Sequence, residues 1–100
     1  MTVRIQTPNT LGIEPALERV KRMEVEFAPL CTRWGVRVVW ESPDFVRLQG
    51  SGSTRGCMGT VTITASEVVV IVRIPLALRW LEPRVEAVIR DRITTELGTG

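Results

Sequence analysis

Few residues of this 100-residue chain have the types and spacing of a reactive site. The sequence contains no His, which removes the commonest general base, the Ser-His and Cys-His nucleophile pairs and most zinc sites. Two carboxylates, Glu41 and Asp44, are close enough in sequence to suggest an acid–base pair. They flank a predicted turn, however, where Asp usually hydrogen-bonds its own backbone. We therefore expect no catalytic residues, and an enzyme built on Glu41 or Asp44 is the third-ranked alternative.

Neither the cysteines nor the glycine-rich segment has the pattern of a metal or phosphate site. Cys31 and Cys57 are isolated, without a Cys-x-x-Cys motif, and are expected to be reduced, buried side chains. The segment 50–56 contains three Gly, two Ser and one Thr, but it precedes a predicted strand and lacks a Gly-Lys-Ser/Thr ending. It is predicted to be a flexible hairpin loop. The sequence thus predicts no metal and no cofactor.

The charge pattern argues against a nucleic-acid partner. The chain has 13 Lys+Arg and 11 Asp+Glu, a net charge of +2, and acidic and basic residues alternate along the predicted helices, as at Glu86 and Arg90. The three tryptophans, Trp34, Trp40 and Trp80, lie in or beside apolar stripes, which favours packing in the core over base stacking.

No segment has the pattern of a membrane span or a secretion signal. The most apolar stretch, 68–78, is interrupted by Arg73 and Pro75 and is shorter than the roughly 20 residues that a membrane helix needs. The first residues lack a charged region followed by an apolar one. The expected location is therefore the cytoplasm.

The periodicity of apolar residues predicts seven elements in one domain, residues 1–100. They are a short strand around Val3 and Ile5, a helix from Ile13 to Trp34, strands at 36–41, 45–49, 58–65 and 68–74, and a second helix entered through 76–81. Gly35 should end the first helix and Gly98 the second. Pro29 should kink the first helix instead of breaking it, because the apolar stripe continues to Trp34.

These elements predict an α+β fold of order β-α-β-β-β-β-α, an antiparallel meander sheet with two helices packed on one face. The expected core comprises Leu17, Val20, Phe27, Trp34, Val38, Trp40, Leu48, Val61, Ile63, Val70, Val72, Val85 and Ile89.

The opposite sheet face is the candidate partner-binding surface, because it mixes large apolar side chains with arginines. Its members are Arg37, Val39, Phe45, Arg47, Met58, Val69, Ile71 and Arg73, with Thr60, Thr62 and Thr64 between them. Three interpretations remain open at this point. The apolar groups are shielded by each other and by Arg stems, or the face forms a homodimer, or it docks onto a hydrophobic surface or small apolar ligand.

Four short strings, in this order, resemble a small bacterial family, the putative polyhydroxyalkanoic acid system proteins. Pro8-Asn9-Thr10-Leu11-Gly12 followed by Ala16 is similar to the family's opening Pro-His-x-Leu-Gly-x-x-x-Ala. The others are Gly35-Val36 leading to Trp40, Gly56-Cys57-Met58-Gly59-Thr60-Val61, and Arg84-Val85-Glu86. The resemblance spans Val3 to about Leu97. It departs at Asn9, where the family usually has His, at Trp80 and Pro83, and in a longer Gly/Ser loop at 50–56.

The resemblance implies association with polyhydroxyalkanoate storage granules, in a family with no established activity and no catalytic residues to transfer. We therefore expect a non-enzymatic accessory or binding protein, a homodimer, that contacts the granule surface or a granule-coat protein. The first alternative is a carrier of a small hydrophobic or acyl ligand held between helices and sheet. The second is a homodimeric domain of unknown function.

Overall fold

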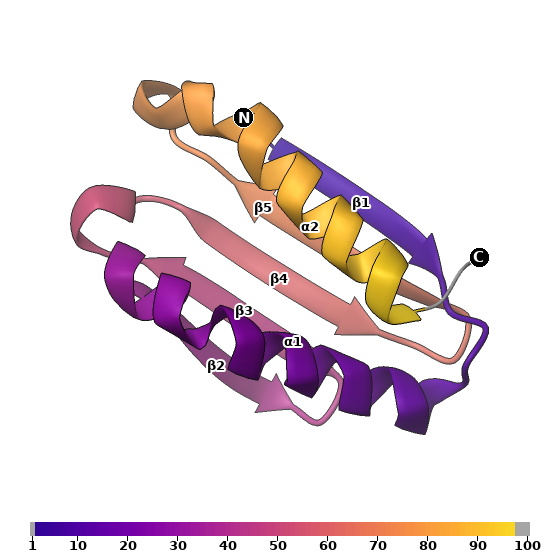
Figure 1. Ribbon diagram of the computed structural model, residues 1–100. Helices are drawn as coiled ribbons and strands as arrows, with labels where there is room; N and C mark the ends of the chain where they lie inside the picture. The colour runs from indigo at the N-terminus through magenta and orange to yellow at the C-terminus, as the bar shows by residue number, and fades with distance from the viewer. Residues whose placement is uncertain (1, 98–100) are drawn as a thin grey trace.

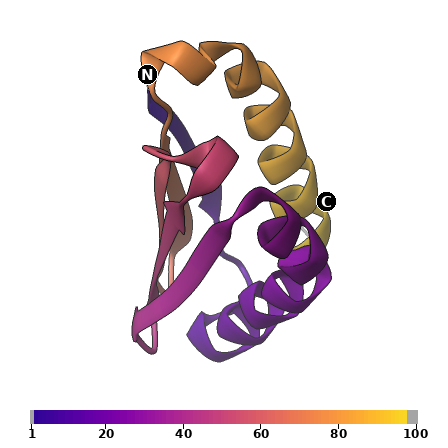
Figure 2. The same cartoon turned by 90° about the vertical axis from the view of Figure 1, so that its left-hand side faces the viewer.

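A five-stranded antiparallel sheet carries both helices on one of its faces (Figures 1 and 2). The structure is a computed structural model that describes the backbone of residues 2–97 and the side chains of residues 2–95. The elements in chain order are β1 (Thr2–Pro8), α1 (Ile13–Trp34), β2 (Val36–Ser42), β3 (Phe45–Gly50), the 3-10 turn η1 (Gly52–Thr54), β4 (Met58–Ile63), β5 (Glu67–Arg73), the 3-10 turn η2 (Leu76–Leu81) and α2 (Glu82–Leu97). The predicted α+β class and element order are confirmed. The expected terminator Gly98 lies outside the described residues.

The strand order is β1-β5-β4-β3-β2, so strands β2 to β5 form the predicted meander. The first strand, whose position the periodicity left open, pairs with β5 on its far side, with Ile5 opposite Val70. Every neighbouring pair is antiparallel. As a result β5 is paired on both sides, and β1 and β2 form the two edges of the sheet.

The core lies between the helices and the inner sheet face. Ile5, Ile63 and Val68 are the largest fully buried side chains, and from the helices they meet Ala16, Val20, Met23 and Ile93. Of the expected core, Val20, Ile63 and Val70 are buried, and Leu17, Phe27, Trp40, Val61, Val72, Val85 and Ile89 pack against it in part. Val38 and Leu48 are half-buried. The expectation was wrong for Trp34, which is 40% exposed, and it omitted Val3, Ile5, Val46 and Val68.

Helix α1 continues without a break through Pro29 and ends at Gly35, as predicted. Gly35 has φ 73°, the left-handed conformation that favours glycine at a helix end. The segment predicted as a flexible hairpin loop instead contains η1, which is hydrogen-bonded to this helix end. The Oγ1 of Thr54 donates to the carbonyl of Trp34 at 2.7 Å, and the Oγ of Ser51 donates to the carbonyl of Gly35 at 2.7 Å. These bonds satisfy carbonyls that a helix end leaves unpaired.

The chain enters α2 through the 3-10 turn η2, in the region where the second helix was expected to begin. Pro83 lies in the first turn of α2, where a missing N–H costs no intrahelical bond. The turn exposes two large apolar side chains, Leu76 at 70% and Trp80 at 66%. Packing in the core was therefore the wrong expectation for Trp80, because this turn lies beyond the end of β5.

Candidate functional site

The residues of the candidate partner-binding surface share the outer face of the sheet, on the side away from the helices (Figure 2). The strand register places Met58 opposite Arg73, Thr60 opposite Ile71 and Thr62 opposite Val69. On the other side of β4, Thr62 also lies opposite Phe45, and Arg47 lies opposite both Thr60 and Val39. Arg4 of β1 joins this face opposite Ile71. Sequence reasoning missed Arg4 because nothing local determines which strand β1 joins.

The large apolar side chains of the outer face are only partly exposed to solvent. Val39 is 40% and Met58 45% exposed, whereas Phe45, Val69 and Ile71 are half-buried among their neighbours. The Nε of Arg47 pairs with Glu41 Oε1 at 3.4 Å, which draws one guanidinium toward the β2 edge. The register places Arg47 opposite Val39, Arg4 opposite Ile71 and Arg73 opposite Met58, so each arginine stem lies next to an apolar side chain.

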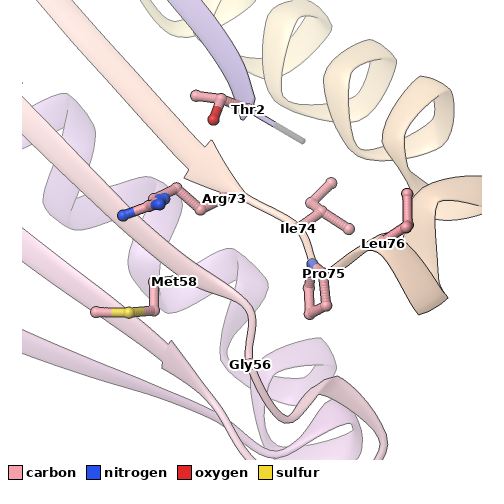
Figure 3. A pocket seen from close by; sticks show the side chains of 7 residues that line it. All are labelled: Thr2, Gly56, Met58, Arg73, Ile74, Pro75 and Leu76. Atoms are coloured by element: carbon pink, nitrogen blue, oxygen red, sulfur yellow. The ribbon is translucent and has the colours of Figure 1, made fainter.

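At one end of the sheet the outer face continues into an open hollow of about 430 Å³ (Figure 3). Its lining consists of Thr2, Gly56, Met58, Arg73, Ile74, Pro75 and Leu76. The side chains of Met58 and Arg73 extend in the same direction, while Ile74 turns away from them (Figure 3). The hollow holds a single charged group and a mixed lining, so it extends the outer face and does not form a separate reactive site.

The second candidate site lies on the inner face, a cavity of about 340 Å³ between the sheet and the two helices. In Figure 1, β4 runs in the space between α1 and α2, because α1 lies toward the β2 side and α2 toward the β1 side. Gly59 and Val61 of β4 belong to the cavity wall. The other walls are almost wholly hydrocarbon: Met23, Phe27, Leu30 and Trp34 from α1, Leu81 from η2, Val85, Val88 and Ile89 from α2, and Val38, Leu48, Val70 and Val72 from the sheet.

The cavity is closed at one end and open at the other. Arg92 of α2 pairs with Glu26 of α1 and lies over the ring of Phe27, 5.9 Å from its centroid, so these contacts join the two helices. Figure 1 shows the helices close together near the C-terminal end of α2 and apart near its N-terminal end. At the open end, Leu30, Trp34 and Val88 line the cavity and are 38%, 40% and 44% exposed.

Few charged groups line this cavity. The Oε1 of Glu24 accepts a hydrogen bond from Trp40 Nε1 at 2.8 Å, and the Nζ of Lys21 lies 5.7 Å from the centroid of the Trp40 ring. This bond fixes α1 against β2 and leaves the Trp40 ring in the wall. Arg84, on the first turn of α2, also lines the cavity, is exposed, and has no ion pair among residues 2–95.

Both cysteines are free, half-buried and part of the cavity wall. Burial raises the pKa of the Cys57 thiol, and burial together with the nearby carboxylate of Glu24 raises the pKa of Cys31. A raised pKa keeps a thiol protonated at neutral pH, and the protonated form is a poor nucleophile. Among the described residues no three His, Cys, Asp or Glu side chains group as metal ligands do.

The two carboxylates at the β2–β3 turn each have a separate partner. Glu41 pairs with Arg47, and Asp44 Oδ1 accepts a hydrogen bond from Ser42 Oγ at 2.8 Å. Both carboxylates are exposed, and neither lines the cavity or the hollow.

A family described as "Putative polyhydroxyalkanoic acid system protein" matches residues 3–97 of this chain. The chain belongs to this family. The match agrees with the span expected from the resemblance, Val3 to about Leu97, and it includes all or nearly all of each element that builds the cavity and the outer face. No curated protein and no solved structure matches the chain. Over residues 2–97, neither helix has the length and hydropathy of a membrane span.

Proposed function

We propose that this protein is a non-enzymatic binding protein that holds an acyl chain in the cavity between its helices and its sheet. The observation that carries the proposal is the cavity itself, about 340 Å³ in volume with hydrocarbon walls. That volume falls at the lower end of the range for small-molecule sites, roughly 300–1,000 Å³. The building blocks of a polyhydroxyalkanoate are hydroxyacyl chains, which are ligands of this chemical class.

An empty cavity of this size is expensive for a small domain. Apolar wall that stays in contact with water at the open end costs about 25 cal/mol per Å², and enclosed volume that neither water nor protein fills costs about 24 cal/mol per Å³. A domain of this length has a total stability of roughly 5–15 kcal/mol. Water is a poor occupant because an apolar wall offers it almost no hydrogen-bond partners. An apolar ligand removes this cost and shields the exposed Leu30, Trp34 and Val88 at the open end.

The proposal is tested by placing a larger side chain on the sheet wall of the cavity. Val61 faces the cavity from β4, and the next residue, Thr62, faces outward. Binding of 1-decanol and of decanoate is followed by tryptophan fluorescence, because Trp34 and Trp40 line the cavity. Val61→Phe should weaken binding of both probes at least about tenfold, while the matched variant Thr62→Phe stays within about twofold of the wild type.

The outcome that contradicts the proposal is equally specific. If neither probe binds to the wild type below its solubility limit, the cavity is not an acyl site. The same conclusion follows if Val61→Phe has the circular dichroism spectrum of the wild type and binds both probes equally well.

A second proposed function, contact with the polyhydroxyalkanoate granule, is supported by the outer sheet face. Val39 and Met58 are exposed there among Arg4, Arg37 and Arg73. A symmetric homodimer through this face would bring the same arginines of two copies together, which is unfavourable. A granule surface that carries apolar and acidic groups fits this face better, and the homodimer is the competing outcome.

A fluorescent fusion in a polymer-accumulating host tests this contact. The fusion should colocalise with granules, and the variant Val39→Glu should be diffuse. The matched control is Val25→Glu on α1, where the native side chain is 73% exposed and does not line the cavity. Diffuse wild-type fluorescence after polymer induction would overturn the granule contact. A dimer in light scattering that Val39→Glu converts to monomer would assign the face to homodimerisation instead.

A further inference from the structure

Among residues 2–95, the charged side chain of Arg84 at the open end of the cavity has no ion pair. Arg84, Val88 and Arg92 follow one another at four-residue steps on α2 and therefore share one side of that helix. All three line the cavity. Arg92 is engaged at the closed end by Glu26 and Phe27, whereas Arg84 has no ion pair among residues 2–95.

From this asymmetry, and resting on the proposed acyl-binding function, we infer that the ligand is an anionic amphiphile whose carboxylate pairs with Arg84 at the open end. Its hydrocarbon tail then extends along α2 toward the closed end beside Phe27. A guanidinium presents a planar fork of N–H donors that matches the two oxygens of a carboxylate. Arg84 is thus a specificity-determining residue that selects acids over neutral chains of the same length.

The charges on the cavity wall favour this orientation over the reverse one. A carboxylate at the closed end would meet Glu24 in the wall and Glu26, which already holds Arg92. The negative charges of a ligand carboxylate and of these glutamates would repel each other inside an apolar site. The acidic residues nearest to Arg84 in sequence, Glu82 and Glu86, do not line the cavity, and Glu86 pairs with Arg90 at 3.0 Å.

The spacing along the helix fits a chain of medium length. Eight residues separate Arg84 from Arg92, which corresponds to about 12 Å along an α-helix. Between them the wall presents Val85, Val88 and Ile89, without a polar group. A chain of this reach places its tail against hydrocarbon along its whole length while the carboxylate stays at the solvent-exposed end, where the cost of desolvating its charge is small.

Two probes with the same hydrocarbon tail test whether Arg84 anchors the ligand carboxylate; this pairing is called the anchor below. Decanoate and 1-decanol are titrated into the wild type, Arg84→Gln and Arg90→Gln by isothermal calorimetry at moderate salt. Arg90 is the matched control, because it lies on the same helix, does not line the cavity, and its substitution removes the same charge. The wild type and Arg90→Gln should prefer decanoate over 1-decanol by about tenfold, and Arg84→Gln should lose this preference while binding 1-decanol within about twofold of the wild type.

The results separate the anchor from the proposed function. If the wild type binds both probes equally, or if Arg84→Gln keeps the preference, the anchor is wrong and the acyl site stands. If Arg90→Gln loses the preference as fully as Arg84→Gln, a general charge effect has been measured and the anchor is again wrong. If neither probe binds, the proposed acyl-binding function fails and the anchor fails with it.

Discussion

Asn9, the residue that stands where the family usually has His, connects two distant parts of the chain. Its side chain is 7% exposed. The Nδ2 group donates to the carbonyls of Gly12 at 3.0 Å and Thr64 at 2.8 Å, and Oδ1 accepts from the N–H of Leu11 at 3.0 Å. Asn9 therefore fastens the β1–α1 loop to the end of β4. Sequence reasoning could flag this position as a departure but not its partners, because Thr64 is 55 residues away.

Replacing Asn9 should destabilise the protein. Asn9→Ala removes three hydrogen bonds and leaves buried backbone groups unpaired, so it should lower the free energy of unfolding by roughly 2–3 kcal/mol. A neutral His has one donor and one acceptor, so Asn9→His can replace at most two of the three bonds and should give an intermediate loss. Urea denaturation measures both values, with the exposed neighbour Thr10→Ala as control. A loss below about 0.5 kcal/mol for Asn9→Ala would contradict this role.

At the scale of elements, local periodicity determined which residues share a face, but not how far apart the helices lie. Strand periodicity of two placed Val39 and Met58 on the outer face and Val61 on the inner face, and the register agrees. The distance between α1 and α2 instead depends on long-range contacts such as Arg92 with Glu26 and the 2.8 Å bond between Trp40 and Glu24. For this reason the sequence suggested a ligand site between the helices and the sheet only as an alternative, without the residues that line it.

Trp34 illustrates this limit of sequence reasoning. It continues the apolar stripe of α1 at the correct helical spacing, and the periodicity therefore assigned it to the core. The helices diverge toward this end (Figure 1), so the stripe leaves the packed layer and Trp34 lines the open end of the cavity. One local feature of the sequence points to the cavity. Gly59 on the inner face of β4 contributes no side chain to the floor, and it is buried there beside Leu48.

At the scale of the whole molecule, one sheet separates two surfaces of different chemistry. The outer face holds Arg4, Arg37, Arg47 and Arg73 around half-buried apolar groups, while the inner face holds the hydrocarbon cavity. The small net charge of +2 therefore conceals an uneven distribution. Ligand in the cavity and contact on the outer face do not compete for space. Granule contact can thus be measured separately from acyl binding, using Val39→Glu, which does not line the cavity, for one and Val61→Phe for the other.

The same geometry predicts that stability depends on cavity occupancy. A ligand at a hundred times its dissociation constant stabilises the folded state by about 2.7 kcal/mol. For a domain of 100 residues, that stabilisation should raise the melting temperature by on the order of 10 °C. Without ligand, Val61→Phe fills part of the cavity and should melt at or above the wild-type temperature, and adding 1-decanol should shift it far less. Scanning calorimetry measures all four temperatures. A wild type that gains less than about 2 °C in this excess of ligand would mean that the ligand does not bind preferentially to the folded state, which contradicts the acyl site.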